Sequence, residues 1–278
     1  MTTTIETAPG VPRSAEEERL LALERTAKRD KWTWRIGGYI AVLGLWEVAS
    51  GTLMDERLLP GPAQIVTTFG EIWSKGELFA NFAATLTRIG IGFSIALVVG
   101  ILVGMLTQKR WLNGYLRDAI LISLTAPGLV WALIGLVIWG FRPMGWIFAI
   151  VLSVFGVLAT NVSEGIKALP KDLLDMARSF KVPTLRIQRN IVIPHLAPFI
   201  FTAMRFGFAN AWRVTVLTEV FSANIGIGFQ MRVATQLFRV DEFFTWVLSF
   251  FVFALFLEKV VLQYFERRFF AWRQEVAT

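Results

Sequence analysis

The sequence predicts an all-α membrane protein, a polytopic bundle of six membrane-spanning helices. Hydrophobic residues make up 55% of its 278 residues, and its mean hydropathy of +0.55 exceeds what the helices of a soluble domain tolerate on their surfaces. Several stretches lack a polar face for about 20 residues, the length that crosses a hydrocarbon core about 30 Å thick. Because unsatisfied backbone groups are costly in lipid, these stretches are expected to be helices.

Six stretches meet this description, and a polar segment stands at each end of the chain. We assign residues 1–33 to an N-terminal tail or short helix, 34–265 to the membrane domain and 266–278 to a C-terminal tail. The six expected spans cover residues 34–53, 83–106, 116–139, 145–162, 196–221 and 243–264.

Lysine and arginine residues indicate how the spans are oriented, because cytoplasmic loops carry an excess of them. With the N-terminus inside, the inner segments hold about three times as many of these residues as the outer ones. Both termini are therefore expected in the cytoplasm. This distribution also explains the net charge of +7. We therefore expect the chain to contact membrane lipids and not nucleic acid. The outer segments contain only Arg57, Lys75, Arg88, Arg142, Arg232 and Arg239.

The residue types exclude several functions. Cysteine is absent and His195 is the only histidine, so thiolate chemistry and His-rich metal sites are excluded. No group of paired carboxylates lies at one membrane depth, which argues against a membrane enzyme. An ion-coupled secondary transporter stays as an alternative, although such proteins use buried carboxylates and often show repeated halves. Here only Glu219 and, less well, Glu47 approach the membrane interior, and no internal repeat is evident.

The second span carries small residues at every fourth position, namely Gly92, Ala96, Gly100 and Gly104. On a helix they form a flat face that lets another backbone approach closely. This face could pack within the subunit or form a seam between two subunits, and the pattern leaves both open.

A basic stretch, residues 165–194, separates spans four and five. It contains two helix-like pieces, 171–180 and 184–191, with Pro183 between them, because proline disfavours the α conformation in the residue before it. A helical hairpin on the cytoplasmic face could insert into a groove of a partner, or it could lie among lipid headgroups.

The sequence Asp175-Met176-Ala177, then Lys181, then Ile191-Val192-Ile193-Pro194 resembles the EAA motif of bacterial ABC importer permeases. In that family Glu-Ala-Ala is followed by three residues, Gly, nine further residues and Ile-x-Leu-Pro, and the spacing here is the same. The resemblance extends over roughly residues 58–273 and is closest to the nitrate/sulfonate/taurine/bicarbonate branch. It includes residues 58–62, Ala126-Pro127, Arg205, Glu219 and residues 266–268.

Asp175, Met176 and Lys181 depart from the motif, where the family has Glu, Ala and Gly. The family glycine usually adopts φ > 0, where other residues are strained by roughly 1 kcal/mol. Lys181 must accept that strain, or the turn must differ, set by Pro183. We expect the hairpin to survive. The resemblance implies that it couples to an ATPase through Asp175, Met176, Ala177, Arg178, Lys181, Ile191 and Pro194.

The resemblance also implies a type I ABC importer permease fold with a cytoplasmic coupling helix, in the bacterial inner membrane. Two cytoplasmic ATP-binding subunits would hydrolyse ATP with Mg²⁺, since this chain has no G-x-x-x-x-G-K-[ST] phosphate loop. The chain itself would hold no cofactor and no metal and would catalyse no reaction. A second permease subunit, most simply a copy of this chain, would share the pathway. A periplasmic or lipid-anchored binding protein would deliver a small anionic solute.

Span five carries the main candidates for that pathway. Arg205, Trp212 and Glu219 are spaced by seven residues and fall within about 40° around a helix. Charged residues at membrane depth normally face a bundle interior or a watery cavity. This stripe could line the pathway or its gate, or it could form an internal ion pair or helix cap. Arg213, about 80° from Arg205, is the candidate for selecting an anion.

Pro127 and Trp131 in span three are further pathway candidates, because proline and the neighbouring Gly128 free backbone groups that a cavity could use. A plain kink is the alternative. Residues 60–82 are too polar to span, and their apolar positions predict an amphipathic helix on the outer surface, through Ile65, Phe69, Ile72 and Trp73.

Overall fold

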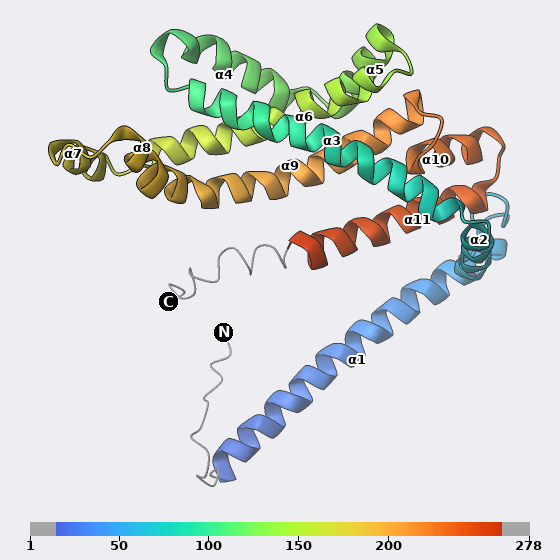
Figure 1. Cartoon of the computed structure of the whole chain (residues 1–278). Helices are drawn as coiled ribbons and strands as arrows, with labels where there is room; N and C mark the ends of the chain where they lie inside the picture. Colours follow the sequence, from blue (N-terminus) through green and yellow to red (C-terminus); the bar gives the residue numbers. More distant parts are fainter. Residues whose placement is uncertain (1–14, 263–278) are drawn as a thin grey trace. The chain divides into compact units, whose positions relative to one another are not determined.

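The computed structural model describes residues 15–262, and every element in that range is an α-helix or a π-helix (Figure 1). The expectations for the C-terminal tail, 266–278, lie outside the described residues. The chain divides into two units, Met1–Gln64 and Ile65–Thr278, and each is described by itself.

The first unit is built on α1 (Ala15–Thr52). Its last turn bends at Gly51, whose φ of 82° is a left-handed conformation that favours glycine. The loop that follows returns to the helix: Ser50 Oγ donates a hydrogen bond to the Leu59 carbonyl at 2.7 Å, and the Ala63 N–H donates to Glu47 Oε2 at 3.2 Å. Glu47 therefore holds the loop against the end of α1. The helix expected over 34–53 exists, but it begins at Ala15.

The second unit holds the remaining helices, the first of which begins just before the division. Four stretches of the described chain are long and apolar enough to cross a membrane: 77–106, 143–167, 184–222 and 240–259. A bent pair would make a fifth. The helices are α2 (Pro62–Ser74), α3 (Glu77–Leu106), α4 (Arg110–Thr125), α5 (Gly128–Trp139), α6 (Pro143–Lys167), α7 (Lys171–Ser179), α8 (Thr184–Ile187), η1 (Gln188–Val192), α9 (Ile193–Ser222), α10 (Ile227–Gln236), α11 (Val240–Phe256) and η2 (Leu257–Leu262).

Helix α6 forms the centre of this unit and packs against both α3 and α9, which also contact each other (Figure 1). Ile150, Val154 and Leu158 of α6 have no exposed surface. The small-residue face of α3 is also buried and packs on α6, because a Cβ on Gly100 would lie 2.4 Å from Leu158 Cβ. Of the two readings of that face, packing within the subunit is the one found.

The third span, expected over 116–139 with Pro127 and Gly128 interrupting it, is broken at that point into two helices. Helices α4 and α5 meet at 102°. Ala126 is extended, with ψ of 126°, as the ring of Pro127 requires of the residue before it. Helix α5 then starts afresh at Gly128.

The fifth span is longer than expected, because α8, η1 and α9 form one stretch from Thr184 to Ser222. The piece 184–191 is therefore the first part of this long helix and not a separate hairpin arm. The π-helical turn at Gln188–Val192 precedes Pro194, which has no N–H for an α-helical hydrogen bond.

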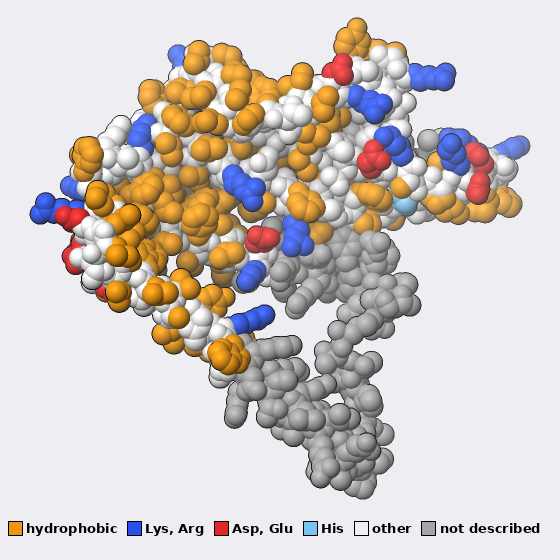
Figure 2. All heavy atoms as spheres, turned by 180° about the vertical axis from the view of Figure 1, so that it is seen from behind, with side chains coloured by type: hydrophobic (Ala, Val, Ile, Leu, Met, Phe, Trp, Pro, Cys, Tyr) orange, Lys and Arg blue, Asp and Glu red, His pale blue; other side chains and the backbone are white. Residues whose placement is uncertain are grey.

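Two short helices complete the unit. The segment 60–82, expected to hold an amphipathic helix, forms α2 up to Ser74 and the start of α3 from Glu77, and α2 buries Ile65 and Ile72. Thr68 Oγ1 donates a hydrogen bond to Asp241 Oδ2 of α11 at 3.1 Å, which ties α2 to the last span. Helix α10, between α9 and α11, was not predicted. Figure 2 shows hydrophobic side chains over much of the face in view, as expected of a protein in lipid. The large apolar residues that are exposed include Phe206, Phe251 and Val252.

Candidate functional site

The three residues of the expected stripe on α9 lie in different surroundings. Arg205 is partly exposed, with a nitrogen 3.9 Å from Glu258 Oε1. Trp212 is buried and stacks on Phe250, with ring centroids 4.9 Å apart. Glu219 is 1% exposed, enclosed between α3 and the start of α10. The stripe thus faces neighbouring helices of the same subunit.

Glu219 is the centre of a buried polar network. Arg88 Nη1 of α3 lies 2.5 Å from Glu219 Oε1. Thr85 Oγ1 donates a hydrogen bond to Oε2 at 2.9 Å, and the Gly228 N–H donates to the same oxygen at 3.0 Å. The carboxylate therefore has a counter-charge and two further donors, which is the condition under which burying an ion pair can be sustained. The sequence analysis gave an internal ion pair as one alternative for Glu219, and the structure contains such a pair with Arg88.

The same network fixes the turn between α9 and α10 onto α3. Asn81 Oδ1 accepts the Gly226 N–H at 2.8 Å, and Thr85 Oγ1 accepts the Ile227 N–H at 3.0 Å. Arg88 Nη1 also donates to the Ile225 carbonyl at 2.6 Å. At Gly226, φ is +127° and a Cβ would lie 2.5 Å from the Glu219 carboxylate, so only glycine fits.

Arg88 is the residue of this network that sequence reasoning missed, since it was counted among the outer segments. It lies within the apolar helix α3. The signal was available, because charged residues inside spans commonly pair with one another, and Glu219 was the matching acid.

Arg213, Pro127 and Trp131 occupy the region where α5 meets α9. Arg213 is exposed, whereas its neighbour Val214 is buried against Gly128, the first residue of α5. Pro127 is exposed and caps the start of α5, and Trp131 packs against the main hydrophobic core. The break in span three and Arg213 thus belong to neighbouring segments.

The EAA segment forms α7 and the turn that follows it. Lys181 adopts φ of 52°, so it takes the left-handed conformation that the family reserves for glycine. Its N–H donates to the Arg178 carbonyl at 2.8 Å, and the Val182 N–H donates to the Ala177 carbonyl at 3.0 Å. This pair of bonds is a Schellman C-cap. Lysine therefore accepts the strained backbone, and the turn is kept.

The other residues of this segment divide into buried and exposed positions. Ala177 is 5% exposed, whereas Met176 and Phe180 are 51% and 78% exposed. Asp175 forms an exposed ion pair with Arg178 at 3.4 Å. In the long helix that follows, Ile191 is half-buried and Pro194 is exposed.

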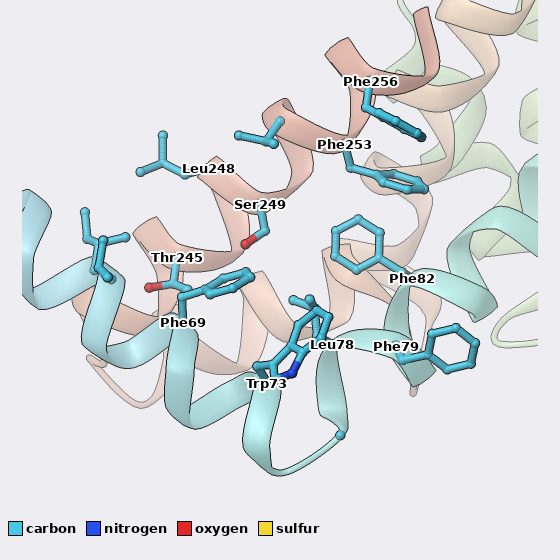
Figure 3. Close-up of a pocket in the computed structure, with 14 residues that line it drawn as sticks. Phe69, Trp73, Leu78, Phe79, Phe82, Thr245, Leu248, Ser249, Phe253 and Phe256 are labelled. Carbon is cyan, nitrogen blue, oxygen red and sulfur yellow. The ribbon is translucent and has the colours of Figure 1, made fainter. Parts of the chain in front are cut away.

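A large apolar groove lies between α2, the start of α3 and α11, with a volume of about 850 Å³. Figure 3 shows aromatic side chains around it, including Phe69, Trp73, Phe82 and Phe253. Its few polar groups include Thr245, whose hydroxyl already donates to the Asp241 carbonyl at 2.7 Å. With no charged residue in its lining, this groove is not suited to hold an anion.

Apolar spans around a buried ion pair, with an EAA segment between two of them, define the chain as a membrane transport permease. The chain belongs to the family of binding-protein-dependent transport system inner membrane components, which matches residues 96–270. The resemblance found in the sequence, to ABC importer permeases of the nitrate/sulfonate/taurine/bicarbonate type, is thereby confirmed.

Several curated proteins are similar over most of their length. The nitrate import permease protein NrtB of Synechococcus elongatus is 30% identical over 198 residues, covering 67% of this chain and 71% of its own. The bicarbonate transport system permease protein CmpB of the same organism is 29% identical, covering 86% and 87%. The taurine transport system permease protein TauC of Escherichia coli is 26% identical, covering 90% and 96%.

Solved structures show the same fold at lower identity. A chain of an amino acid ABC transporter has a TM-score of 0.59 at 18% identity, covering 72% of this chain and 97% of its own. A chain of the inward-facing MetNI methionine ABC transporter has a TM-score of 0.55 at 15% identity, covering 66% and 90%. This chain therefore shares its helical fold with chains of these two ABC transporters.

Replacing Lys181 by glycine should stabilise the EAA segment by up to about 1 kcal/mol, because it removes the cost of the left-handed conformation. Hydrogen exchange of the α7 amides should slow accordingly. Lys171→Gly is the control, because residue 171 is the first helical residue of α7 and gains nothing from glycine. Equal or faster exchange in Lys181→Gly than in the wild type would contradict this account.

Proposed function

We propose that this chain is the permease subunit of a bacterial ABC importer for a small anionic solute. Two permease subunits, most simply two copies of this chain, frame the pathway. Helix α1, the bent α4–α5 pair and the four long apolar helices make six spans, with both termini cytoplasmic. Two cytoplasmic ATP-binding subunits supply the energy with ATP and Mg²⁺, and a periplasmic or lipid-anchored binding protein delivers the solute.

The observation that carries this proposal is the EAA segment, with its spacing, its capped turn and its exposed apolar side chains. Met176, Phe180 and Leu185 are 51%, 78% and 78% exposed, although charged residues surround them. Large exposed apolar residues with a polar rim are the usual anchors of a protein interface. A short helix that presents such anchors between two spans is suited to insert into a groove of an ATPase.

The proposal is tested by co-purifying the chain with the ABC-type ATPase subunits encoded in the same genome. We expect a stable complex whose ATPase activity depends on the permease. Phe180→Glu should weaken the complex about 30-fold, the effect of losing a hot spot of about 2 kcal/mol. Phe141→Glu, at another exposed phenylalanine, which lies between α5 and α6, should leave it unchanged. Uptake that continues without any ATPase would instead favour an ion-coupled transporter.

Arg213 is the residue that we propose contacts the anion. It lies exposed on a span, where an unneeded charge would be costly, and the relatives named for nitrate, bicarbonate and taurine transport point to anionic or zwitterionic solutes. Neutralising it should remove a charge-assisted hydrogen bond of about 1.5–3 kcal/mol.

Arg213→Gln should therefore lower uptake by about 10- to 100-fold, measured with radiolabelled substrate in proteoliposomes that contain the whole transporter. Arg213→Lys should retain part of the uptake, because it keeps the charge. Arg117→Gln, at an exposed arginine of α4, is the control for a general loss of positive charge. Full uptake by Arg213→Gln with normal ATPase coupling would discard the contact.

A further inference from the structure

The turn between α10 and α11 holds Phe238 in a strained backbone conformation. Its φ is 57°, and Lys181 is the only other non-glycine residue with a positive φ in the described part of the chain. This left-handed conformation is a rare outlier for a bulky residue. The Phe238 N–H donates to the Thr235 carbonyl at 3.2 Å. The Arg239 N–H donates to the Ala234 carbonyl at 2.9 Å. This pair of bonds is the Schellman C-cap of α10, in which glycine is the usual residue.

The ring of Phe238 gains no packing within the subunit that would offset this strain. Phe238 is 89% exposed, the highest value among the large apolar residues whose exposure the structure describes, and Leu237 beside it is 55% exposed. A glycine at position 238 would form the same two hydrogen bonds without the strain and without losing a contact in the core. Because strained residues cluster where they serve a function, we expect this side chain to serve a contact outside the subunit.

Charged groups surround this pair of apolar residues. Arg239 forms an ion pair with Glu242 at 3.1 Å, and Asp241 accepts a hydrogen bond from α2. Because charged side chains avoid the hydrocarbon layer, Leu237 and Phe238 stand at the level of the polar surface and not among lipid tails. The aromatic residues typical of the membrane interface are Trp and Tyr, which have a polar tip that phenylalanine lacks. An exposed aromatic residue with a polar rim instead suits a protein interface.

This turn and the EAA segment lie at opposite ends of α9 (Figure 1). With 30 residues, α9 is about 45 Å long, so the proposed ATPase contact at α7 is far from this turn. The family is one of binding-protein-dependent transport systems. We infer that Phe238, together with Leu237, is an anchor on which the solute-binding protein docks, an inference that rests on the proposed function. The two C-cap bonds hold the ring in place before docking, which reduces the entropy lost on binding.

The test uses the complete permease–ATPase complex in lipid nanodiscs. The probes are the purified solute-binding proteins encoded in the same genome, and the Kd of each for the complex is measured. Phe238→Ala should weaken docking about 30-fold, the effect of losing an aromatic hot spot. Phe238→Gly should weaken docking as much and yet raise the melting temperature by about 2–4 °C, because glycine removes the strain at the C-cap. A ring with a structural role would not combine weaker docking with higher stability.

Phe251→Ala is the matched control, because Phe251 is also exposed but lies within the apolar helix α11. It should keep the wild-type Kd. Wild-type docking by both Phe238 variants would overturn the site, as would a wild-type complex that retains its ATPase and binds none of the probes. Separation of the two permease subunits by these variants in size-exclusion chromatography would place the ring against a second copy and also overturn it. Failure of the proposed function would instead appear as loss of the ATPase complex in the wild type.

Discussion

Glu219→Ala should destabilise the protein by about 3–5 kcal/mol, because it leaves the Arg88 guanidinium largely buried without its counter-charge. The side chain of Arg88 is 15% exposed and that of Glu219 is not exposed at all. The same change also leaves the Gly228 N–H without its acceptor. Reversible unfolding in mixed detergent micelles measures this loss.

A double-mutant cycle separates the ion pair from the rest of the network. The double variant Arg88→Met/Glu219→Gln should lose less stability than the sum of the two single changes. Each single change leaves one buried charge unpaired, whereas the double variant buries no charge at this site. The pair Lys167–Glu164, 2.7 Å apart with both side chains more than half exposed, is the control. Glu164→Ala should cost less than about 1 kcal/mol. A cost for Glu219→Ala no greater than that would contradict the assigned role.

The long apolar helices could be predicted from the sequence, because hydropathy over about 20 residues is a local property. The ends were less predictable. The stretch Thr184–Ser222 is continuous, whereas span five was expected to begin at residue 196, just after Pro194. The π-helical turn Gln188–Val192 lies just before Pro194, which has no N–H, and the helix continues through this point.

The Arg88–Glu219 pair illustrates what the sequence could not supply. Its members are 131 positions apart, and their contact depends on how α3 and α9 are set against α6. Seven-residue spacing placed Glu219 on one face with Arg205, but it could not say which helix that face meets. Helix α10 was missed although Ile227, Met231 and Ala234 are buried at helical spacing, because its ten residues are too short for a span.

The strain at Lys181 could be foreseen as one of two outcomes, because the motif fixes the position of the turn. Which outcome occurs depends on the C-cap bonds to Arg178 and Ala177, which form only when the residue after the cap is left-handed. The sequence therefore predicted where the turn lies, and the backbone geometry showed that Lys181 adopts the left-handed conformation there.

Gly100→Ala should destabilise the protein by about 1–3 kcal/mol, because a Cβ there would lie 2.4 Å from Leu158 Cβ and 3.1 Å from the Phe155 carbonyl oxygen. The backbone of α6 and a β-carbon cannot move aside as the end of a flexible side chain can. The contact between α3 and α6 must therefore widen along the small-residue face, which includes Gly104. Unfolding in mixed detergent micelles and the melting temperature should both report the loss.

Gly90→Ala supplies the control on the same helix, because nothing lies within 4 Å of a Cβ at that position. Alanine is favoured over glycine in a helix by up to about 1 kcal/mol, so Gly90→Ala should be neutral or stabilising. The two substitutions are chemically identical, and only the distance between helices differs at the two sites. If Gly100→Ala proved as stable as Gly90→Ala, α3 and α6 would not be in close backbone contact, and the small-residue face would be free for another subunit.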